Sequence, residues 1–403
     1  MHYTSLVERV GGRGAAAWAL HGLGVEQQRR TGKEVIFLTV GEPDFDTPQV
    51  IQEAAVASMR AGNTHYTPIV GTRALRQAIA DWHETTAGQA VDPAQVVVAP
   101  GAQCALFCVM QCLAEAGDEV ITTDPRYSTY EAVIGASGAR LVSVPLLPDR
   151  GFALDLEALG RAITPRTRVL LLNTPHNPTG AVLTPAELEA IAALCRAHDL
   201  WLVCDEVYAA LTYDAPHHSP SALPGMAERS VVVSSLSKSH AMTGWRLGWA
   251  IGPKRLAEHL DNLMLCMLYG CPGFIQDAAV AALTEGRGAV AEMHAAYRRR
   301  RDLVAPWLDR LPNLACATPA GGMFAMLDVR RSGLAAEAFA RRLLEEESVA
   351  VLPGGGFGEQ AEGFCRLSLG FHDETLAEAC RRMEAFAGRL AAGQPAAAAV
   401  PRA

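Results

Sequence analysis

Lys238 is the residue of this 403-residue chain best suited to covalent chemistry, because hydroxyls, glycine and apolar residues surround it. The stretch from Ser234 to Trp249 reads S-S-L-S-K-S-H-A-M-T-G-W-R-L-G-W. Burial lowers the pKa of a lysine ammonium, which suits an amine that attacks a carbonyl. Ser235 and Arg246, on either side of Lys238, are good phosphate ligands. A group that requires both an amine and a phosphate site is pyridoxal 5′-phosphate (PLP). A solvated lysine in a serine-rich turn is the other interpretation.

Two further segments place polar side chains at the ends of apolar runs. N-T-P-H-N-P-T-G follows the run 168–172 and contains Asn177, and D-E-V-Y follows the run 201–204 and begins with Asp205. A buried aspartate requires a partner. A protonated pyridine nitrogen would supply that partner, and the ion pair would keep the ring an electron sink. Asp205 is therefore the predicted partner of the PLP ring, whereas N-P-T-G alone could be a tight turn.

A glycine-led turn, Gly101-Ala102-Gln103, stands between an apolar run and an apolar helix. The free N–H groups and the dipole at a helix N-terminus favour an anion, although most such turns bind nothing. Tyr127 follows the next apolar run, and its ring could stack on a pyridine or simply pack in the core.

The elements that must position these residues are short apolar strands, most of them separated by helical stretches. Strands of this kind, covered on both faces, form parallel sheets that bind ligands at their carboxyl ends, where the candidate residues lie. The predicted fold class is α/β, with a mostly parallel seven-stranded sheet in a large domain and a smaller α+β domain. The predicted strands of the large sheet are 96–99, 119–123, 140–144, 168–172, 201–204, 231–234 and 247–251.

The chain length suggests two domains. Residues 1–45 are predicted to be an N-terminal arm that joins the small domain and includes a strand at 35–40. Residues 46–285 are predicted to form the large PLP-binding domain, and 286–390 the small C-terminal domain. Residues 391–403 are rich in Ala and Pro and are expected to be a disordered tail.

Arg366 lies within an apolar strand of the predicted small domain. An unpaired guanidinium would be costly in that position. One interpretation is therefore a structural salt bridge, and the other is a site that holds a carboxylate ligand.

Composition restricts the remaining function classes. The net charge is −8 without a basic block, so nucleic acid and anionic membranes are unexpected partners. The chain has no apolar run near eighteen residues and no apolar segment at Met1–Arg13, which argues against a membrane or secreted form. None of the ten cysteines forms a C-x-x-C pair, and those at 104, 108 and 112 recur at helical spacing without a histidine. The sequence thus predicts no metal site and a reduced, cytoplasmic enzyme.

Taken together and in this order, the motifs resemble those of the class I/II aminotransferases of fold type I, from about Val35 to Gly370. The resemblance implies that Lys238 binds the cofactor and then moves a proton as general base. It implies that Asn177 and Tyr208 contact the 3-oxygen of PLP, that Asp205 pairs with its ring nitrogen and that Tyr127 stacks on its ring. From the resemblance and from the chemistry of the side chains, the expected phosphate ligands are Gly101, Ala102, Gln103, Ser235, Ser237 and Arg246.

The resemblance also implies substrate and partner contacts. Gly41, in G-E-P-D-F-D-T-P, would border the α-carboxylate of the substrate, and Arg366 would hold it bidentately, with Asn177 beside it. Tyr66 would reach the phosphate of the neighbouring subunit in a homodimer. The expected reaction moves an amino group from an L-amino acid to a 2-oxo acid by a ping-pong mechanism.

A narrower resemblance concerns the substrates. The stretches at 15–18, 62–66, 100–106, 235–246 and 266–270 look like those of arginine–pyruvate aminotransferases. Arginine, or another basic amino acid, is therefore the expected donor and pyruvate the expected acceptor. A cationic donor calls for acidic residues in the side-chain pocket, and Glu42, Asp44 and Asp46 are the nearby candidates.

Three alternatives remain beside this reading. An aminotransferase for aspartate or aromatic amino acids would share every motif, and so would a PLP-dependent β-lyase of the same fold. A transcription regulator with an aminotransferase-like domain would require a DNA-binding module, for which residues 1–34 are too short and too poor in basic residues.

Overall fold

The computed structural model of the protein describes residues 2–11 and 18–393. Most of the predicted tail, residues 394–403, lies outside the described residues, and so do residues 15–17 of the narrower resemblance. The described part of the predicted tail is the end of a helix and a turn, because the last helix extends to Ala391.

A large sheet forms the centre of the molecule, with the strand order β2-β9-β8-β7-β6-β3-β4-β5. The neighbours from β8 to β4 pair in parallel, whereas β9 is antiparallel to both β8 and β2. All seven predicted strands are present, and the short β5 pairs antiparallel with β4 as an added edge strand. The strands are β2 (Val96–Ala99), β3 (Glu119–Asp124), β4 (Arg140–Leu147), β5 (Ala153–Leu154), β6 (Thr167–Asn173), β7 (Trp201–Asp205), β8 (Ser230–Ser235) and β9 (Gly248–Ile251).

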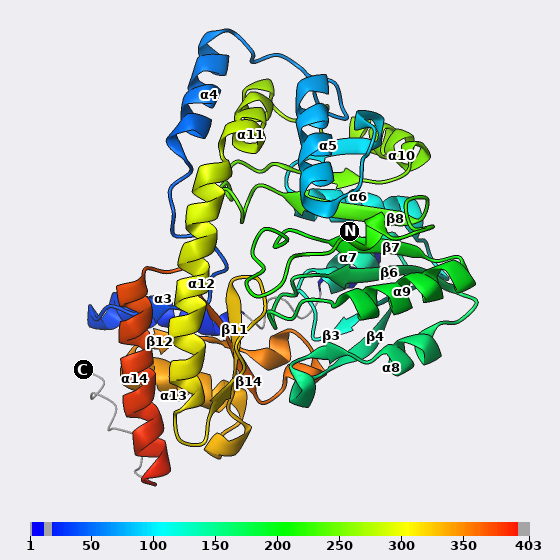
Figure 1. Ribbon diagram of the computed structural model, residues 1–403. Coiled ribbons are helices and arrows are strands. Elements are labelled where there is room, and N and C mark those ends of the chain that lie inside the picture. The colour runs from blue at the N-terminus through cyan, green and yellow to red at the C-terminus, as the bar shows by residue number, and fades with distance from the viewer. Residues whose placement is uncertain (1, 12–17, 394–403) are drawn as a thin grey trace.

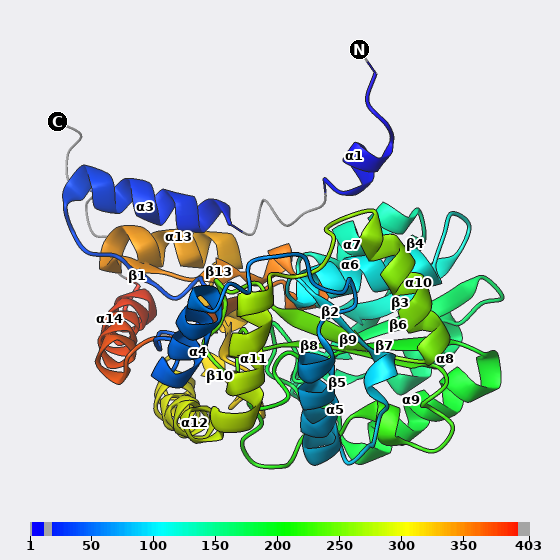
Figure 2. The ribbon, with the colours of Figure 1, turned by 90° about the horizontal axis from the view of Figure 1, so that it is seen from above.

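Helices cover both faces of this sheet, as Figure 2 shows. Alternate strand residues point to opposite faces, so Val97 packs toward α6, α7 and α10, while Val96 and Val98 pack toward α4, α5 and α11. Leu170 and Leu172 pack toward α8 and α9. The bounds are α4 (Gln49–Arg60), α5 (Arg73–Ala87), α6 (Ala102–Leu113), α7 (Tyr130–Ser137), α8 (Leu156–Ala162), α9 (Pro185–His198), α10 (Lys254–Leu265) and α11 (Gly273–Glu285).

A second hydrophobic core combines the N-terminal arm with the C-terminal third of the chain. It lies at the left and below in Figure 1 and surrounds a four-stranded sheet of order β10-β11-β14-β13 and a two-stranded sheet, β1-β12. The bounds are α3 (Ala19–Thr31), β1 (Ile36–Phe37), α12 (Arg287–Asp309), β10 (Ala315–Cys316), β11 (Phe324–Asp328), α13 (Ala336–Glu347), β12 (Val349–Ala350), β13 (Leu352–Pro353), β14 (Phe364–Ser368) and α14 (Asp373–Ala391). The short helix α1 (Leu6–Arg9) lies instead beside α7, where the Arg9 side chain donates a hydrogen bond to the Gly135 carbonyl.

The strand predicted at 35–40 is wrong in length, since only Ile36 and Phe37 pair with a neighbouring strand. The residues that follow leave the ladder, and Leu38 and Thr39 use their carbonyls to accept hydrogen bonds from β14. The helix α11 ends at Glu285 and α12 begins at Arg287. The exact domain boundaries stay a prediction.

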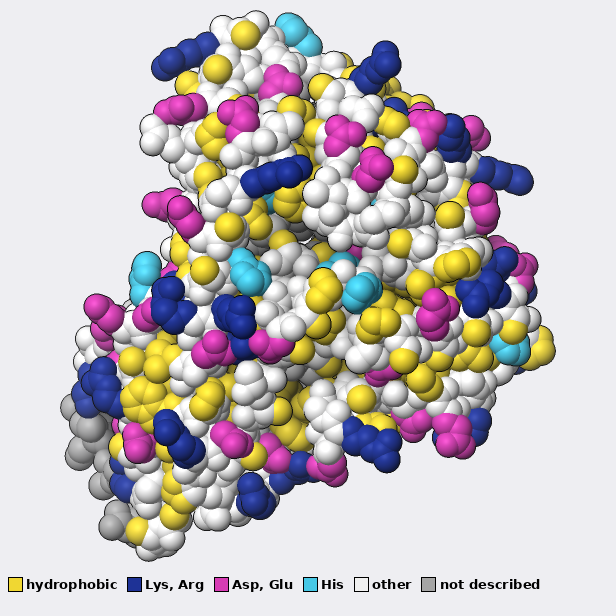
Figure 3. Space-filling view, in the orientation of Figure 1, with side chains coloured by type: hydrophobic (Ala, Val, Ile, Leu, Met, Phe, Trp, Pro, Cys, Tyr) yellow, Lys and Arg dark blue, Asp and Glu magenta, His cyan; other side chains and the backbone are white. Residues whose placement is uncertain are grey.

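The surface carries charges of both signs. On the face in Figure 3, Lys and Arg side chains are interspersed with Asp and Glu among uncharged and hydrophobic areas. None of the described helices combines the length and the apolar character needed to cross a bilayer. Within the described residues, no three or more His, Cys, Asp or Glu side chains gather closely enough to hold a metal ion.

Candidate active site

An open pocket lies at the carboxyl ends of β6, β7 and β8, where the two cores meet. Its wall includes twelve of the residues predicted to bind the cofactor or the substrate, together with the acidic candidate Glu42, and it leaves out Gly101 and Tyr66. The predicted residues in the wall are Gly41, Ala102, Gln103, Tyr127, Asn177, Asp205, Tyr208, Ser235, Ser237, Lys238, Arg246 and Arg366. Residues in the wall that the sequence did not single out are Trp18, Val40, Leu106, Asn173, Val207, Thr243 and Phe324.

Lys238 lies in the loop after β8, and its Nζ donates a hydrogen bond to the carbonyl oxygen of Gly41 over 2.6 Å. Burial lowers the pKa of the Lys238 ammonium to about 8; Glu42 opposes this shift, and Arg366 and Arg246 add to it. With this pKa, roughly a tenth of the amine is neutral at pH 7, far more than for an ordinary lysine. Lys238 is therefore prepared to act as a nucleophile near neutral pH.

Asp205 ends β7 and is 4% exposed. Burial raises the pKa of its carboxyl to about 6, although a hydrogen bond from Tyr130 lowers it. The Tyr130 hydroxyl donates to Oδ2 over 2.7 Å, and the Val207 N–H donates to Oδ1 over 3.3 Å. Tyr130 was not predicted, because the sequence shows only two tyrosines three residues apart and not which one reaches a carboxylate 75 residues away.

Asn177 and Tyr208 meet on the next part of the wall. The Asn177 side chain donates from Nδ2 to the Tyr208 hydroxyl over 3.4 Å, and its Oδ1 accepts from Arg366 Nη1 over 3.1 Å. The Asn177 backbone N–H donates to Asn173 Oδ1 over 2.7 Å. Burial raises the pKa of Tyr208, so its hydroxyl keeps its proton at neutral pH.

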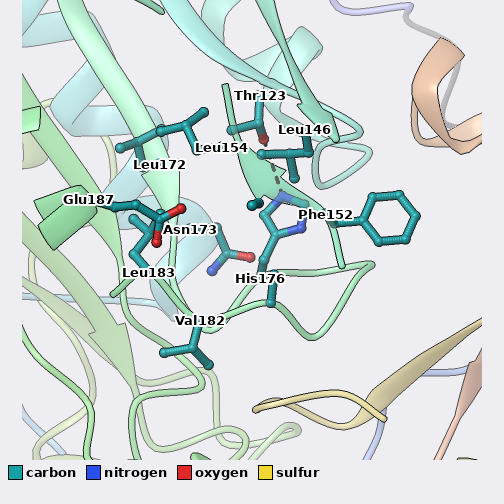
Figure 4. A pocket seen from close by; sticks show the side chains of 12 residues that line it. Thr123, Leu146, Phe152, Leu154, Leu172, Asn173, His176, Val182, Leu183 and Glu187 are labelled. Atoms are coloured by element: carbon teal, nitrogen blue, oxygen red, sulfur yellow. Dashed lines mark hydrogen bonds between the residues drawn. The ribbon is translucent and has the colours of Figure 1, made fainter. Parts of the chain in front are cut away.

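A smaller cavity lies beside the turn that carries Asn177, and the side chain of the preceding residue, His176, lines it (Figure 4). Its wall is mostly aliphatic, with the His176 ring directed toward Thr123. The two ring nitrogens of His176 pair with the hydroxyls of Thr123 and Thr179, at 3.2 and 2.8 Å. Burial lowers the pKa of His176 to about 3, so the ring is a neutral anchor for the turn.

Arg366 on β14 is 3% exposed, and its guanidinium donates from Nη2 to the Thr39 carbonyl over 2.6 Å. Its carbon lies 4.2 and 4.8 Å from the ring centroids of Phe324 and Phe357. No carboxylate oxygen of residues 2–11 and 18–393 lies within 4.0 Å, so the interpretation as a structural salt bridge is wrong. Its Nε is buried without a hydrogen-bond partner among the same residues, and burial lowers the pKa of Arg366 to about 10. A carboxylate ligand would compensate this charge.

The N-terminus of α6 offers hydrogen-bond donors that suit an anion. Gly101 caps the helix at φ +81° without a side-chain cap, which leaves the N–H groups of Ala102 and Gln103 free. A Cβ on Gly101 would lie 2.5 Å from Arg246 Nη2, and one on Gly248 would lie 2.5 Å from the backbone nitrogen of Ala102. Only glycines therefore allow the arginine and the helix end to come together here. With Ser235 and Ser237 in the same wall, the donors suit a doubly charged phosphate.

Tyr66, Asp44 and Asp46 lie outside this pocket wall, and Tyr66 was expected only at the site of a neighbouring subunit. Tyr66 is 87% exposed, and its ring lies 5.4 Å from that of Tyr269. Of the three acidic candidates for a cationic side chain, Glu42 is in the wall. Asp44 accepts hydrogen bonds from Arg300 at 2.7 and 2.9 Å, and Asp46 is outside the wall.

These features fit PLP: an amine of lowered pKa, a buried carboxylate with a free side toward the pocket, and a phosphate site built by glycines. At the carboxyl ends of parallel strands, they define a PLP-dependent enzyme of fold type I. The chain belongs to the aminotransferase class I and II family, whose model matches residues 33–383. It is therefore a PLP-dependent aminotransferase.

Similar proteins agree with this family. The chain is 54% identical to the arginine–pyruvate transaminase AruH of Pseudomonas aeruginosa, over 97% of this chain and 99% of that protein. It is 39% identical to an aspartate aminotransferase of Musicola paradisiaca, over 88% and 90% of the two chains. Among solved structures, a Thermus thermophilus aspartate aminotransferase mutant has a TM-score of 0.90 at 36% identity, covering 96% of this chain and 99% of that one.

Proposed function

We propose that this aminotransferase transfers the amino group of L-arginine, or of another basic amino acid, to pyruvate. The observation that carries the proposal is the 54% identity to an arginine–pyruvate transaminase over nearly the whole of both chains. The identity to the aspartate aminotransferase of Musicola paradisiaca is 39%. Glu42 adds support, because it places an exposed carboxylate in the pocket wall where a guanidinium could pair with it.

In the proposed site, each residue has one task. PLP, when bound, supplies an aldehyde for the amino group and an electron sink for the α-carbon. Arg366 holds the α-carboxylate with its two outer nitrogens, and Gly41 borders it. Lys238 would hold the cofactor through Nζ, and once the amine of the donor has replaced it there, the freed Nζ would move a proton from the substrate α-carbon to the cofactor side. The pKa of about 8 supports this role, since the amine can lose and regain a proton near neutral pH.

The other residues hold the cofactor. Asp205 pairs with the ring nitrogen, Asn177 and Tyr208 donate to the 3-oxygen, and Tyr127 stacks on the ring. The hydrogen bond between Asn177 and Tyr208 supports their shared task. The proposed phosphate ligands are Gly101, Ala102, Gln103, Ser235, Ser237 and Arg246.

We propose further that the enzyme is a homodimer in which Tyr66 of each subunit completes the phosphate site of the other. The exposure of Tyr66 and its position outside the wall of its own pocket support a contact across an interface. The cytoplasm is the proposed compartment, because all ten cysteines are free thiols. The proposed domains are an arm at 1–45, a PLP-binding domain at 46–285 and a small domain at 286–390.

The test is a half-reaction screen of the PLP-loaded enzyme with single amino acids. L-Arginine should remove the absorbance band of the bound cofactor, and pyruvate should restore it with formation of L-alanine. The Lys238→Ala variant should show neither change. If aspartate or an aromatic amino acid acts and arginine does not, the substrate proposal is wrong. Release of a thiol or persulfide from a cysteine derivative, without a 2-oxo acid from any amino donor, would favour the β-lyase.

A further inference from the structure

The carboxylate of Asp205 is held mainly by one tyrosine hydroxyl. Tyr130 is 1% exposed, and its Oη donates to Asp205 Oδ2 over 2.7 Å. Within the described residues, the other hydrogen bond to this carboxylate is the longer one from Val207 N–H, and no lysine or arginine lies within 4.0 Å. A neutral donor therefore fixes one oxygen and leaves the other side of the carboxylate facing the pocket.

Tyr130 is itself rigidly placed. It is the first residue of α7, and its backbone N–H donates to the Tyr127 carbonyl over 3.1 Å. Its ring packs edge to face on that of Tyr127, with centroids 5.6 Å apart and an interplanar angle of 83°. The side chain of Thr129 donates to Gln103 Oε1 over 2.9 Å, which ties the same turn to the anion site. The hydroxyl consequently has little freedom to leave Asp205.

The surroundings of Asp205 make such a donor necessary. Burial favours the protonated acid, and the neighbouring carboxylate of Glu206 acts in the same direction. A protonated Asp205 could not form an ion pair with a pyridinium nitrogen. A hydrogen bond donated to the ionised oxygen stabilises the charged form without adding a competing charge.

We propose that Tyr130 is a positioning residue for the transamination, which acts through Asp205 to keep its carboxylate ionised and directed at the ring nitrogen of PLP. This inference rests on the proposed role of Asp205. Tyr130 does not belong to the pocket wall and would not touch the cofactor.

The test compares full-length Tyr130→Phe and wild-type enzymes in the equilibrium binding of two cofactors. One is PLP, and the other is its 1-deaza analogue, in which CH replaces the ring nitrogen. A hydrogen bond to a charged group predicts that Tyr130→Phe weakens PLP binding about tenfold or more. Binding of the deaza analogue should not change, because the analogue has no nitrogen for Asp205. Tyr297→Phe is the matched control, since it also removes a buried hydroxyl, one without a hydrogen-bond partner in the described chain.

Equal weakening of both cofactors would overturn the inference, because Tyr130 would then matter only for packing. Unchanged binding of both would overturn it as well. In the Asp205→Asn background, Tyr130→Phe should have little further effect on PLP binding. If Asp205→Asn itself does not distinguish the two cofactors, the proposed role of Asp205 is wrong. If Asp205→Asn distinguishes them and Tyr130→Phe does not, only the role of Tyr130 is wrong.

Discussion

Arg300 and Arg366 are equally buried, each 3% exposed, but they are compensated in different ways. Arg300 on α12 donates to both carboxylate oxygens of Asp44, at 2.7 and 2.9 Å, and to Asp373 at 3.1 Å. Within the described residues, Arg366 on β14 has only a backbone carbonyl and the amide of Asn177 as acceptors. The buried guanidinium of Arg300, which joins structural elements, is thus paired with carboxylates. The buried guanidinium of Arg366, which faces the pocket, is left free to pair with a ligand.

Packing does not explain this difference. The guanidinium carbon of Arg300 lies 4.9 and 5.5 Å from the ring centroids of Phe45 and Tyr297. Arg366 lies between Phe324 and Phe357 at similar distances. Both arginines are therefore held between aromatic rings, and the carboxylates alone distinguish a structural arginine from one that is available to a ligand.

The largest expected effect is on stability, in Arg300→Met. This change leaves Asp44 without its bidentate partner and should lower the free energy of unfolding by about 3 kcal/mol. Denaturant unfolding of the PLP-loaded enzyme measures the change. Arg299→Met is the matched control, because the exposed Arg299 pairs with Asp373 on the surface and should contribute no more than about 1 kcal/mol. Equal losses for both variants would contradict the distinction between buried and exposed pairs.

The second effect is on catalysis, in Arg366→Gln. We expect kcat/KM for the amino donor to fall about 100-fold or more, because charge-assisted hydrogen bonds to the substrate carboxylate contribute about 1.5–3 kcal/mol each. The variant should lose less stability than Arg300→Met, since it removes hydrogen bonds to two uncharged acceptors and leaves no carboxylate without its partner. Steady-state kinetics measures the fall in kcat/KM, and denaturant unfolding measures the change in stability. A stability loss as large as that of Arg300→Met would remove the contrast between the two arginines.

The smallest effect concerns the pH at which Lys238 reacts. In cofactor-free enzyme, the rate of PLP capture should rise with pH and reach half its maximum near pH 8, where the amine loses its proton. Arg366 and Arg246 lower this pKa, while Glu42 and Asp205 raise it. Arg366→Gln removes one repelling cation, so the ammonium becomes more stable and the midpoint should move to higher pH. Stopped-flow absorbance measures the profile, and a midpoint shift to lower pH would contradict the electrostatic contact.

The large sheet was predictable from the sequence because its strands are continuous β-branched and aliphatic runs that need cover on both faces. Periodicity could not reveal β5, whose two residues show no pattern, or the early end of β1. The chain leaves that ladder after Phe37 because Thr39 and Gly41 offer their carbonyls to Arg366 and Lys238. The donors of these hydrogen bonds lie about 200 residues or more further along the chain, so local sequence does not indicate where β1 ends.

The same reason limits prediction of the site. The order of the motifs brought most candidates to one pocket, because parallel strands end at a common edge. Glu42 and Asp44 are two residues apart and both carry a carboxyl group, yet Glu42 lies in the pocket wall and Asp44 does not. Arg300, which binds the Asp44 carboxylate outside the pocket wall, is 256 residues further along the chain. Local sequence does not contain that information, and the roles of the individual site residues stay predictions.

The hydrogen bond from Arg366 to Thr39 spans 327 residues and has a consequence for synthesis of the protein. Once a ribosome has added Ile251, it has already made helix α6, strand β7 with Asp205 and the loop after β8 with Lys238. Strand β14 follows more than a hundred residues later. Domains fold largely as units during translation. We therefore expect the proposed PLP ligands of a nascent chain to be in place before Arg366 is available to bind an amino acid. If Arg366 has the proposed role, the growing chain thus acquires its substrate-binding arginine last among the proposed site residues.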